Sequence, residues 1–313
     1  MKTSLLAILS LVLILVSSNA IKAQQDVQLT QFMHDKLSIN PGIAGMSNTI
    51  CATGIYRSQW TKFDGAPKTA LFNFQMPVQV LGGGIGFTYY NDQLGFESNN
   101  IARLHYSYHT TIGNGLGDVG IGASVGLISK RFGAQWVTPS GDNWWEDPSI
   151  SSPTASATTS DFSIGLYYRT PKLYLGLSST HLTESNLSSL SIRTDRHYWV
   201  MAGYRLRLAS APQFEIQPNI LAKSDGASTQ IDINTLIYFR NQFYAGVSYR
   251  VGDAIAPMAG FKWGVGPGAM SFGYSHDITT SNLQNYSSGS HEVSLKYCFK
   301  IDKPYKERYT TPR

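Results

Sequence analysis

The feature that most constrains this chain is an alternation of apolar and polar residues with a period of two, repeated in many short runs. In residues 292–300 one face is apolar or aromatic and the other mostly polar: Val293, Leu295, Tyr297 and Phe299 against Glu292, Ser294, Lys296 and Cys298. The same pattern occurs in residues 102–109 and 243–250. Because successive side chains of a strand point to opposite faces, this period predicts strands. A strand with an aromatic-rich apolar face and a polar face is typical of a wall between lipid and water.

Composition favours a membrane barrel over a soluble sandwich. Only 14% of the 313 residues are charged and 12% are aromatic, whereas an average soluble domain carries roughly 25% charged residues. A lipid-facing surface with aromatic girdles accounts for both values. The net charge of +5 is not accompanied by a basic stripe or a nucleic-acid-binding motif, so we expect no nucleic-acid partner.

The alternating runs predict an all-β fold, a transmembrane antiparallel β-barrel of about fourteen strands. The predicted strands are 49–60, 67–77, 82–91, 100–112, 118–130, 160–170, 171–181, 196–208, 212–223, 228–240, 241–251, 256–264, 267–276 and 290–300. Connections after odd-numbered strands are mostly long and polar, such as 131–159, and those after even-numbered strands are mostly short and rich in turn residues, such as 113–115. Outer-membrane barrels place long loops outside and tight turns in the periplasm, so both termini are predicted to be periplasmic.

The N-terminus indicates export. Lys2 precedes an apolar stretch from Leu5 to Val16, which is followed by small residues up to Ala20 or Ala23. This pattern predicts a signal peptide over residues 1–23; the alternative, an uncleaved anchor, is disfavoured because a spanning helix needs about 20 apolar residues. We therefore divide the remaining chain into a periplasmic or lumenal segment, 24–48, a barrel, 49–300, and a periplasmic tail, 301–313. The expected location is the outer membrane.

The two cysteines lie at the ends of the predicted barrel. Cys51 is near the start of the first strand and Cys298 near the end of the last, and closure of the barrel would make these two strands neighbours. Opposed residues of antiparallel strands have Cα separations that a disulfide can bridge. The sequence predicts a disulfide across this seam; the alternative is two unpaired, partly buried thiols.

A series of short motifs resembles a known family. The motifs are Gln31-Phe32-Met33, Leu37-Ser38-Ile39-Asn40-Pro41-Gly42-Ile43-Ala44-Gly45, Tyr56-Arg57-Ser58-Gln59-Trp60, Gly65-Ala66-Pro67-Lys68-Thr69, Gly273-Tyr274-Ser275-His276-Asp277 and Ser288-Gly289-Ser290-His291-Glu292-Val293. Together, from about Gln28 to Phe299, they resemble the PorP/SprF family of type IX secretion system membrane proteins of Bacteroidetes. One departure is Gly42, where the family pattern has Ala; the residue remains small.

The resemblance implies a non-enzymatic outer-membrane component of type IX protein secretion or gliding motility. Such a protein would support export or surface anchoring of secreted proteins, through contacts with periplasmic machinery or with a large adhesin. Its partners would then be the lipid bilayer, periplasmic secretion components and a secreted adhesin, and no cofactor is implied. The alternative function is an outer-membrane diffusion channel or a transporter of hydrophobic solutes.

Two sets of residues are candidates for function. The alternation of side chains along the predicted strands places four of them towards the lumen: Arg57, Gln59, Arg103 and His105. The predicted outer loop 131–159 carries three tryptophans, Trp136, Trp144 and Trp145, and exposed tryptophans often mark binding surfaces. Asn40 and Pro41 are candidates either for a partner contact or for a turn, because Asn and Pro initiate turns.

Catalytic and metal sites are disfavoured by spacing. Ser107 lies between His105 and His109 on one strand face, about 7 Å from each by the strand rise, too far for a nucleophile to bond its base directly. His276, Asp277, His291 and Glu292 could hold a metal, but their spacing fits no standard signature and a polar barrel rim explains them equally. We expect no catalytic, cofactor or metal site.

Overall fold

The computed structural model describes residues 26–133, 155–187, 190 and 192–300 of the chain. Within these ranges it is an all-β protein with a closed, antiparallel barrel of fourteen long strands. The predicted fold class is confirmed. The barrel strands are β1 (Thr49–Ser58), β2 (Lys68–Val78), β3 (Gly83–Leu94), β4 (Glu97–Ile112), β5 (Gly117–Phe132), β6 (Ser156–Arg169), β7 (Leu173–Thr180), β10 (His197–Tyr204), β12 (Phe214–Ser224), β13 (Thr229–Phe239), β14 (Phe243–Arg250), β15 (Ala254–Val265), β16 (Gly268–Thr279) and β17 (Ser290–Lys300).

Short elements complete the described chain. They are the strands β8 (Asn186–Leu187), β9 (Ile192–Arg193) and β11 (Leu206–Arg207), and the 3-10 turns η1 (Pro41–Ile43), η2 (Gln79–Leu81), η3 (Gly113–Gly115) and η6 (Asn282–Asn285). None of the helical turns in the described ranges has the length and apolar character of a membrane-spanning helix.

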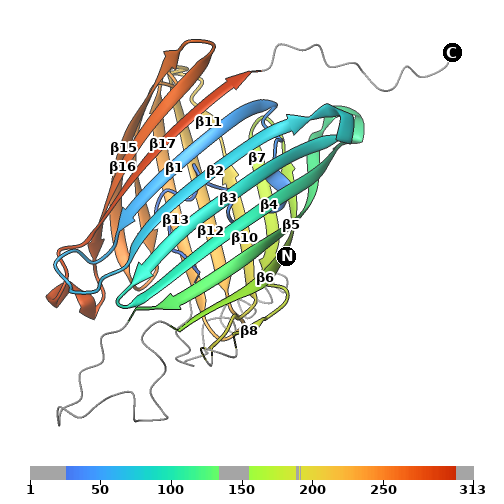
Figure 1. Cartoon of the computed structure of the whole chain (residues 1–313). Helices are drawn as coiled ribbons and strands as arrows, with labels where there is room; N and C mark the ends of the chain where they lie inside the picture. Colours follow the sequence, from blue (N-terminus) through green and yellow to red (C-terminus); the bar gives the residue numbers. More distant parts are fainter. Residues whose placement is uncertain (1–25, 134–154, 188–189, 191, 301–313) are drawn as a thin grey trace, which may run out of the picture.

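Each barrel strand pairs with its neighbours in the chain order, and the first and last strands close the sheet. β1 pairs antiparallel with β17 over its whole length, with Cys51 opposite Cys298 and Arg57 opposite Glu292. Opposite this seam, β10 pairs with β7 on one side and with β12 on the other. The short strand β11 pairs with the beginning of β12. Figure 1 shows the strands tilted around a common axis. This tilt is what closure of a sheet into a barrel requires.

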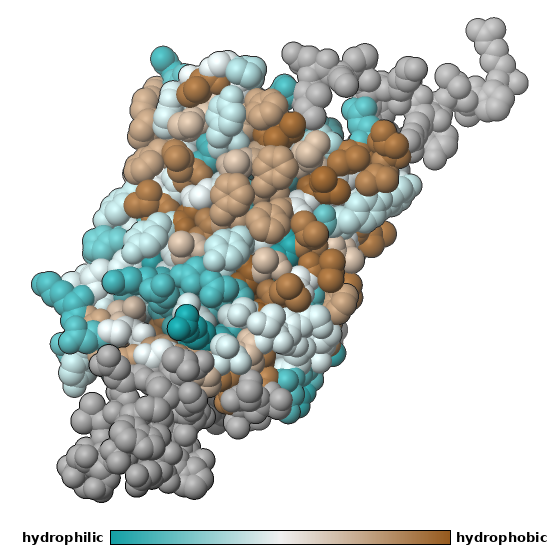
Figure 2. Space-filling view, in the orientation of Figure 1, coloured by the Kyte–Doolittle hydropathy of each residue, from teal (hydrophilic) through white to brown (hydrophobic). Residues whose placement is uncertain are grey.

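The outer wall is apolar where the alternation predicts it. On β4, Leu104, Tyr106 and Tyr108 are exposed, whereas Arg103, His105 and Ser107 are buried inside the barrel. The same separation occurs on β14, where Phe243, Val247 and Tyr249 are exposed. Figure 2 shows apolar and aromatic side chains gathered over the middle and upper wall, with more hydrophilic side chains near the lower end. Exposed apolar surface of this extent belongs in lipid.

The two ends of the barrel differ. The connections 79–82, 170–172 and 240–242 lie at the end where β1 begins and β17 ends, which we call the short-turn end (Figure 1). The connections 59–67, 181–196 and 280–289 lie at the opposite, long-loop end. One expected long loop, 91–99, is instead a hairpin in which β3 and β4 continue to Leu94 and Glu97. Its polar residues indicated a loop, but they pair across the two strands.

Residues 26–48, before the first strand, lie inside the barrel, and we call them the inner segment. Leu29 packs in an apolar cluster with wall residues such as Ile55 and Ile101. Phe32, Ile39 and Met46 pack in a second cluster with wall residues that include Tyr167, Trp199 and Met201. The core of this protein therefore lies between the inner segment and the inner wall of the barrel.

Candidate functional site

The inner segment approaches the wall closely where the wall is glycine. A Cβ added at Gly84, Gly120 or Gly122 would come within 3.0 Å of the backbone of residues 41–45. η1 lies against β4, β5 and β6 at this point. Only residues without a side chain let two backbones approach to this distance. The wall glycines thus explain how a folded segment fits within the lumen.

Asn40 fixes the conformation of the inner segment at this contact. Its Nδ2 donates to the carbonyl oxygens of Leu166 (3.0 Å) and Leu177 (3.2 Å) in the wall. Its Oδ1 accepts from the backbone N–H of Gly42 (2.8 Å), which caps η1. Asn40 and Pro41 are buried. They hold the inner segment to β6 and β7, which agrees with the turn interpretation, and a partner contact at these residues stays a prediction.

Arg57 is the centre of a buried charge network near the long-loop end. Its guanidinium lies 2.8 Å from an Asp277 carboxylate oxygen and 3.2 Å from a Glu292 oxygen, and its side chain is 1% exposed. Arg250 also bonds Asp277 (2.9 Å) and bonds Asp232 (3.0 Å). Buried charges are tolerated when they are paired and hydrogen-bonded in this way. Strands β1, β13, β14, β16 and β17 are thereby joined across the lumen.

The same network binds the inner segment. The carboxylate of Glu292 accepts the backbone N–H groups of Thr30 (2.8 Å) and Gln31 (2.7 Å). The Thr30 hydroxyl donates to Asp277 (2.8 Å) and accepts from Arg57 (2.8 Å). Charge-assisted bonds of this kind are about twice as strong as neutral ones. They fix residues 30 and 31 against the inner wall near the long-loop end.

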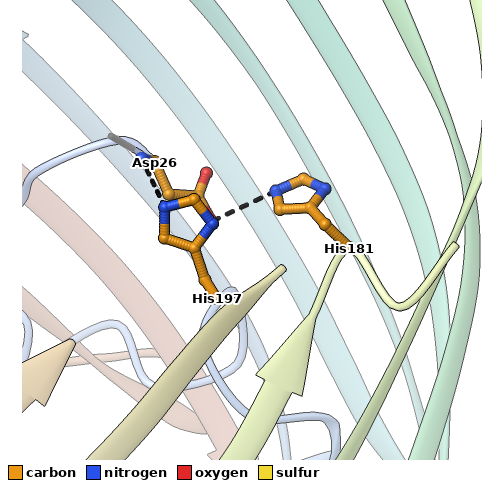
Figure 3. Close-up of side chains that lie close together, drawn as sticks. All are labelled: Asp26, His181 and His197. Carbon is orange, nitrogen blue, oxygen red and sulfur yellow. Dashed lines mark hydrogen bonds and ion pairs between the residues drawn. The ribbon is translucent and has the colours of Figure 1, made fainter. Parts of the chain in front are cut away.

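A second network lies around Arg103. Its Nε donates to Asp161 (2.6 Å), whose other oxygen lies 3.0 Å from His181 Nδ1. His181 Nε2 lies 3.4 Å from the carboxylate of Asp26, at the start of the described inner segment. His197 Nε2 accepts the backbone N–H of Asp26 (3.3 Å). Figure 3 shows Asp26, His181 and His197 converging inside the barrel.

Electrostatics in this second network favour positive charge between the two carboxylates. Burial alone would lower the pKa of His181, but Asp26 and Asp161 raise it to about 9. Burial would raise the pKa of Asp26, but His181, His197 and Arg103 hold it well below its usual value. The charged form of His181 is therefore stabilised by its surroundings.

A large basic cavity opens at the short-turn end. Its volume is about 980 Å³, and it is lined by the inner segment and by turns of that end. Its lining includes seven basic side chains and two acidic ones: Lys36, Arg169, Lys172, Arg205, Lys262, Lys296 and Lys300 against Asp35 and Asp118. Asp118 is paired with Arg169 (3.1 Å), and Asp35 accepts hydrogen bonds from Ser38 and Asn73. Of the basic side chains in the lining, Lys172, Arg205, Lys262 and Lys300 are exposed, so this end of the barrel carries an excess of positive charge.

The structure places the remaining predicted residues as follows. Arg103 and His105 are buried on the inner face of β4, and Arg57 is buried on that of β1. Gln59 instead follows the end of β1, where its backbone N–H bonds Pro67 O (2.9 Å). Trp136, Trp144 and Trp145 lie outside the described residues, so their partner contact stays a prediction.

The residues considered for a catalytic site on β4 and for a metal site near the last loop do not converge in the structure. His105 bonds Thr88 (2.9 Å) and Ser107 donates to Gly42 O (2.8 Å), so neither bonds the other. Asp277 and Glu292 point into the lumen, whereas alternation places His276 and His291 on the opposite face of the same strands. The two histidine rings lie against each other, tilted by 34°, with centroids 4.6 Å apart.

The cysteines face each other across the seam. Cys51 and Cys298 are directly opposed in the β1–β17 register, with Cα atoms 4.2 Å apart and their sulfurs bonded. The bond lies on the inner face near the short-turn end. Its formation in the exported protein stays a prediction, tested below.

Sequence reasoning missed the contacts that join distant parts of the chain. Asp26 meets His197 across 171 positions, and Thr30 meets Glu292 across 262. Strand parity could have placed Asp161, Asp232 and Arg250 on the inner face, but no local pattern indicates which of them meet. His181 lies in a loop, where parity gives no orientation.

Comparison with known proteins identifies the family. Residues 21–297 match the family described as type IX secretion system membrane protein PorP/SprF. The chain belongs to the PorP/SprF family. A search of curated proteins gave no significant match. Membership in PorP/SprF, together with the barrel and its apolar wall, makes this chain an outer-membrane β-barrel protein.

Three solved structures that match this chain are compared by identity, coverage and TM-score. The CymD monoaromatic hydrocarbon channel shares 11% identity, with a TM-score of 0.56 over 90% of this chain and 95% of that one. The toluene transporter TbuX of Ralstonia pickettii shares 10% identity, with a TM-score of 0.47 over 85% and 93%. Omp33 of Acinetobacter baumannii shares 8%, with a TM-score of 0.44 over 81% and 99%. At these identities the PorP/SprF chain shares with CymD a barrel fold alone.

Proposed function

We propose that this protein is a non-enzymatic outer-membrane component of type IX secretion that supports the export or surface anchoring of secreted proteins, with a role in gliding where the secreted protein is an adhesin. It does so by docking periplasmic machinery at its short-turn end. Residues 1–23 direct export as a signal peptide, and the tail 301–313 lies in the periplasm. Family membership supports the secretion role.

The basic cavity carries the docking part of the proposal. Lys172, Arg205 and Lys262 are exposed at the short-turn end and line this cavity, and none of them forms an ion pair with another described residue. Complementary charge steers encounters and fixes register between partners. An acidic segment of a periplasmic secretion component fits the cavity best. The long-loop end, facing the cell exterior, is then free for a secreted adhesin.

The non-enzymatic assignment rests on the polar groups of the lumen. Buried histidines and carboxylates of the described chain are engaged in structural bonds: His105 with Thr88 of the wall, His181 with Asp161, and Glu292 with Thr30 of the inner segment. A nucleophile needs an adjacent base within hydrogen-bond reach, and Ser107 is instead bonded to Gly42 O. These groups hold the inner segment in place.

The inner segment also bears on the alternative function, a channel or transporter for hydrophobic solutes. The first part of the inner segment fills the lumen near the long-loop end with a packed apolar and charged core. We therefore expect no large, stable conductance in a planar bilayer. A persistent open pore in the wild-type protein would favour the channel and contradict a plugged scaffold.

The docking proposal is tested by reversing charge at the cavity. The Lys172→Glu, Arg205→Glu variant should recover less periplasmic secretion machinery than wild type in pull-downs from native membranes, and secretion should fall in a strain that carries only this variant. The control, Lys68→Glu, Arg193→Glu, reverses two basic residues at the long-loop end.

Two outcomes separate the parts of the proposal. Unchanged pull-down by the cavity variant, with normal barrel insertion, would reject the docking site while leaving the secretion role intact. Normal secretion from a strain that lacks the whole protein would reject the secretion role itself.

A further inference from the structure

We propose that Asp26, His181 and His197 form a site for a divalent transition-metal ion such as Zn²⁺. The ligands are one Asp26 carboxylate oxygen and the Nε2 atoms of the two histidines. The site joins the beginning of the described inner segment to the loop after β7 and to the start of β10 (Figure 3). This function is independent of docking at the opposite end.

The donor atoms are already gathered. One ligand atom from each residue lies within 4.8 Å of the other two. In a tetrahedral zinc site with bonds of about 2.0–2.1 Å, ligand atoms are about 3.3 Å apart. Small rotations of three side chains therefore suffice. Three protein ligands leave a fourth position for water, as in other sites with two or three imidazoles.

Both histidines have their second ring nitrogen held by an acceptor. His181 Nδ1 lies 3.0 Å from the Asp161 carboxylate, and His197 Nδ1 lies 3.0 Å from the carbonyl oxygen of Asp195. When Nδ1 donates in a neutral ring, the lone pair is on Nε2; in His181 this atom lies 3.4 Å from the Asp26 carboxylate, and in His197 it accepts the Asp26 backbone N–H. A metal ion would therefore replace the second proton of His181 and the N–H contact of His197. Metal-binding histidines show this arrangement, because the outer acceptor fixes the ring and increases its basicity.

The surrounding charges select the kind of metal. Arg103 Nη2 lies 3.4 Å from His181 Nε2, and Lys223 Nζ donates to the Asp26 carbonyl (3.2 Å). The Arg103 contact would be displaced by a metal, while its stronger bond to Asp161 (2.6 Å) remains. Two cations against two carboxylates provide no excess negative charge for Ca²⁺ or Mg²⁺, which prefer several oxygen ligands. Imidazole donors instead favour zinc-like ions.

Occupancy would fasten the inner segment to the wall. Asp26 is the ligand that belongs to the segment, and Tyr90 holds its other oxygen (2.9 Å). A metal bound to Asp26 and to two wall histidines adds a crosslink about 4 residues before the Thr30 contacts. The segment would then be held at both its beginning and its Asn40 contact.

The test is a metal titration of the full chain in detergent. The protein is stripped with EDTA, returned to chelator-free buffer and titrated with Zn²⁺ against a chromophoric chelator. We expect one equivalent of tightly bound zinc. Asp161→Asn, which replaces the charged outer acceptor with a neutral one, should weaken binding about 10–100-fold, and His197→Gln, which removes a ligand, should weaken it more. The control is His109→Gln, an inner-face histidine at the short-turn end, which should bind zinc like wild type.

A second measurement distinguishes a variant that fails to fold from one that has lost only the metal site. Heat-modifiable gel mobility reports whether each variant forms a barrel. The X-ray absorption spectrum of the zinc-loaded wild type should show two imidazole ligands and oxygen. The proposal is overturned if wild type binds no equivalent of zinc, if folded His197→Gln binds as tightly as wild type, or if the spectrum lacks imidazole.

Discussion

At the scale of single residues, the lumen of this barrel is organised by buried charges. Arg57 bonds two carboxylates from β16 and β17 and one hydroxyl of the inner segment. A buried charge destabilises a protein when its oppositely charged partner is removed. The stability of each member of such a network therefore depends on the others. The network thus couples closure of the wall to placement of the segment.

Replacing Arg57 tests this dependence. Arg57→Met removes a positive partner from the buried negative charges of Asp277 and Glu292. It should destabilise the barrel by about 3–5 kcal/mol. The measurement is urea-induced unfolding in lipid vesicles, followed by tryptophan fluorescence. The control is Arg207→Met, whose ion pair with Glu215 is largely exposed and should be worth no more than about 1 kcal/mol. Equal losses in the two variants would contradict the role of Arg57.

At the scale of elements, the strands were predictable because each carries its own signal. In β14 the outward residues are apolar, and the inward ones, apart from Tyr244, are small or polar, so the period alone gives the strand and its faces. The β3–β4 hairpin was not predicted fully, because Asn91, Asp92 and Asn99 are polar although they pair across strands. Near the end of the wall both faces are polar, and the alternation vanishes.

The candidate sites were less predictable than the strands. The cluster of Asp26, His181 and His197 depends on barrel closure and on the path of the inner segment. Neither is encoded by spacing along the chain. The parity of β4 predicted that Arg103 faces inward, but not that Asp161 is its partner.

The wall glycines give a prediction about the inner segment. A side chain at position 122 would occupy the space of residues 41 and 42, so Gly122→Val should expel the segment from this part of the lumen. The control is Gly54→Val, because a Cβ there meets nothing within 4 Å. We expect faster proteolysis within residues 26–48 and a raised bilayer conductance for Gly122→Val only. Protection equal to wild type would show that the contact is dispensable.

At the scale of the whole molecule, the barrel is sealed where the first strand meets the last. The register sets Cys51 opposite Cys298 and Arg57 opposite Glu292, so the seam carries a covalent bond near one end and an ion pair near the other. The rest of the seam is the antiparallel ladder, with apolar and aromatic side chains such as Tyr56, Tyr297 and Phe299 along it. Such reinforcement is expected where a sheet edge must not reopen.

The seam disulfide is tested on protein purified without reductant. A disulfide-linked peptide pair containing Cys51 and Cys298 should be found by mass spectrometry and should disappear on reduction. Cys298→Ser should lower the free energy of unfolding by about 2–4 kcal/mol. Two free thiols in the folded, membrane-inserted protein would disprove the pairing.

The enclosed inner segment limits the order in which this protein can be assembled. The segment is synthesised before every strand, yet the wall around it is complete only when β17 has reached β1. Until then two long strand edges are open to wrong partners. We therefore expect the insertion machinery to release the chain late, after its last strand has been delivered, and a chain truncated before β17 to be degraded rather than inserted.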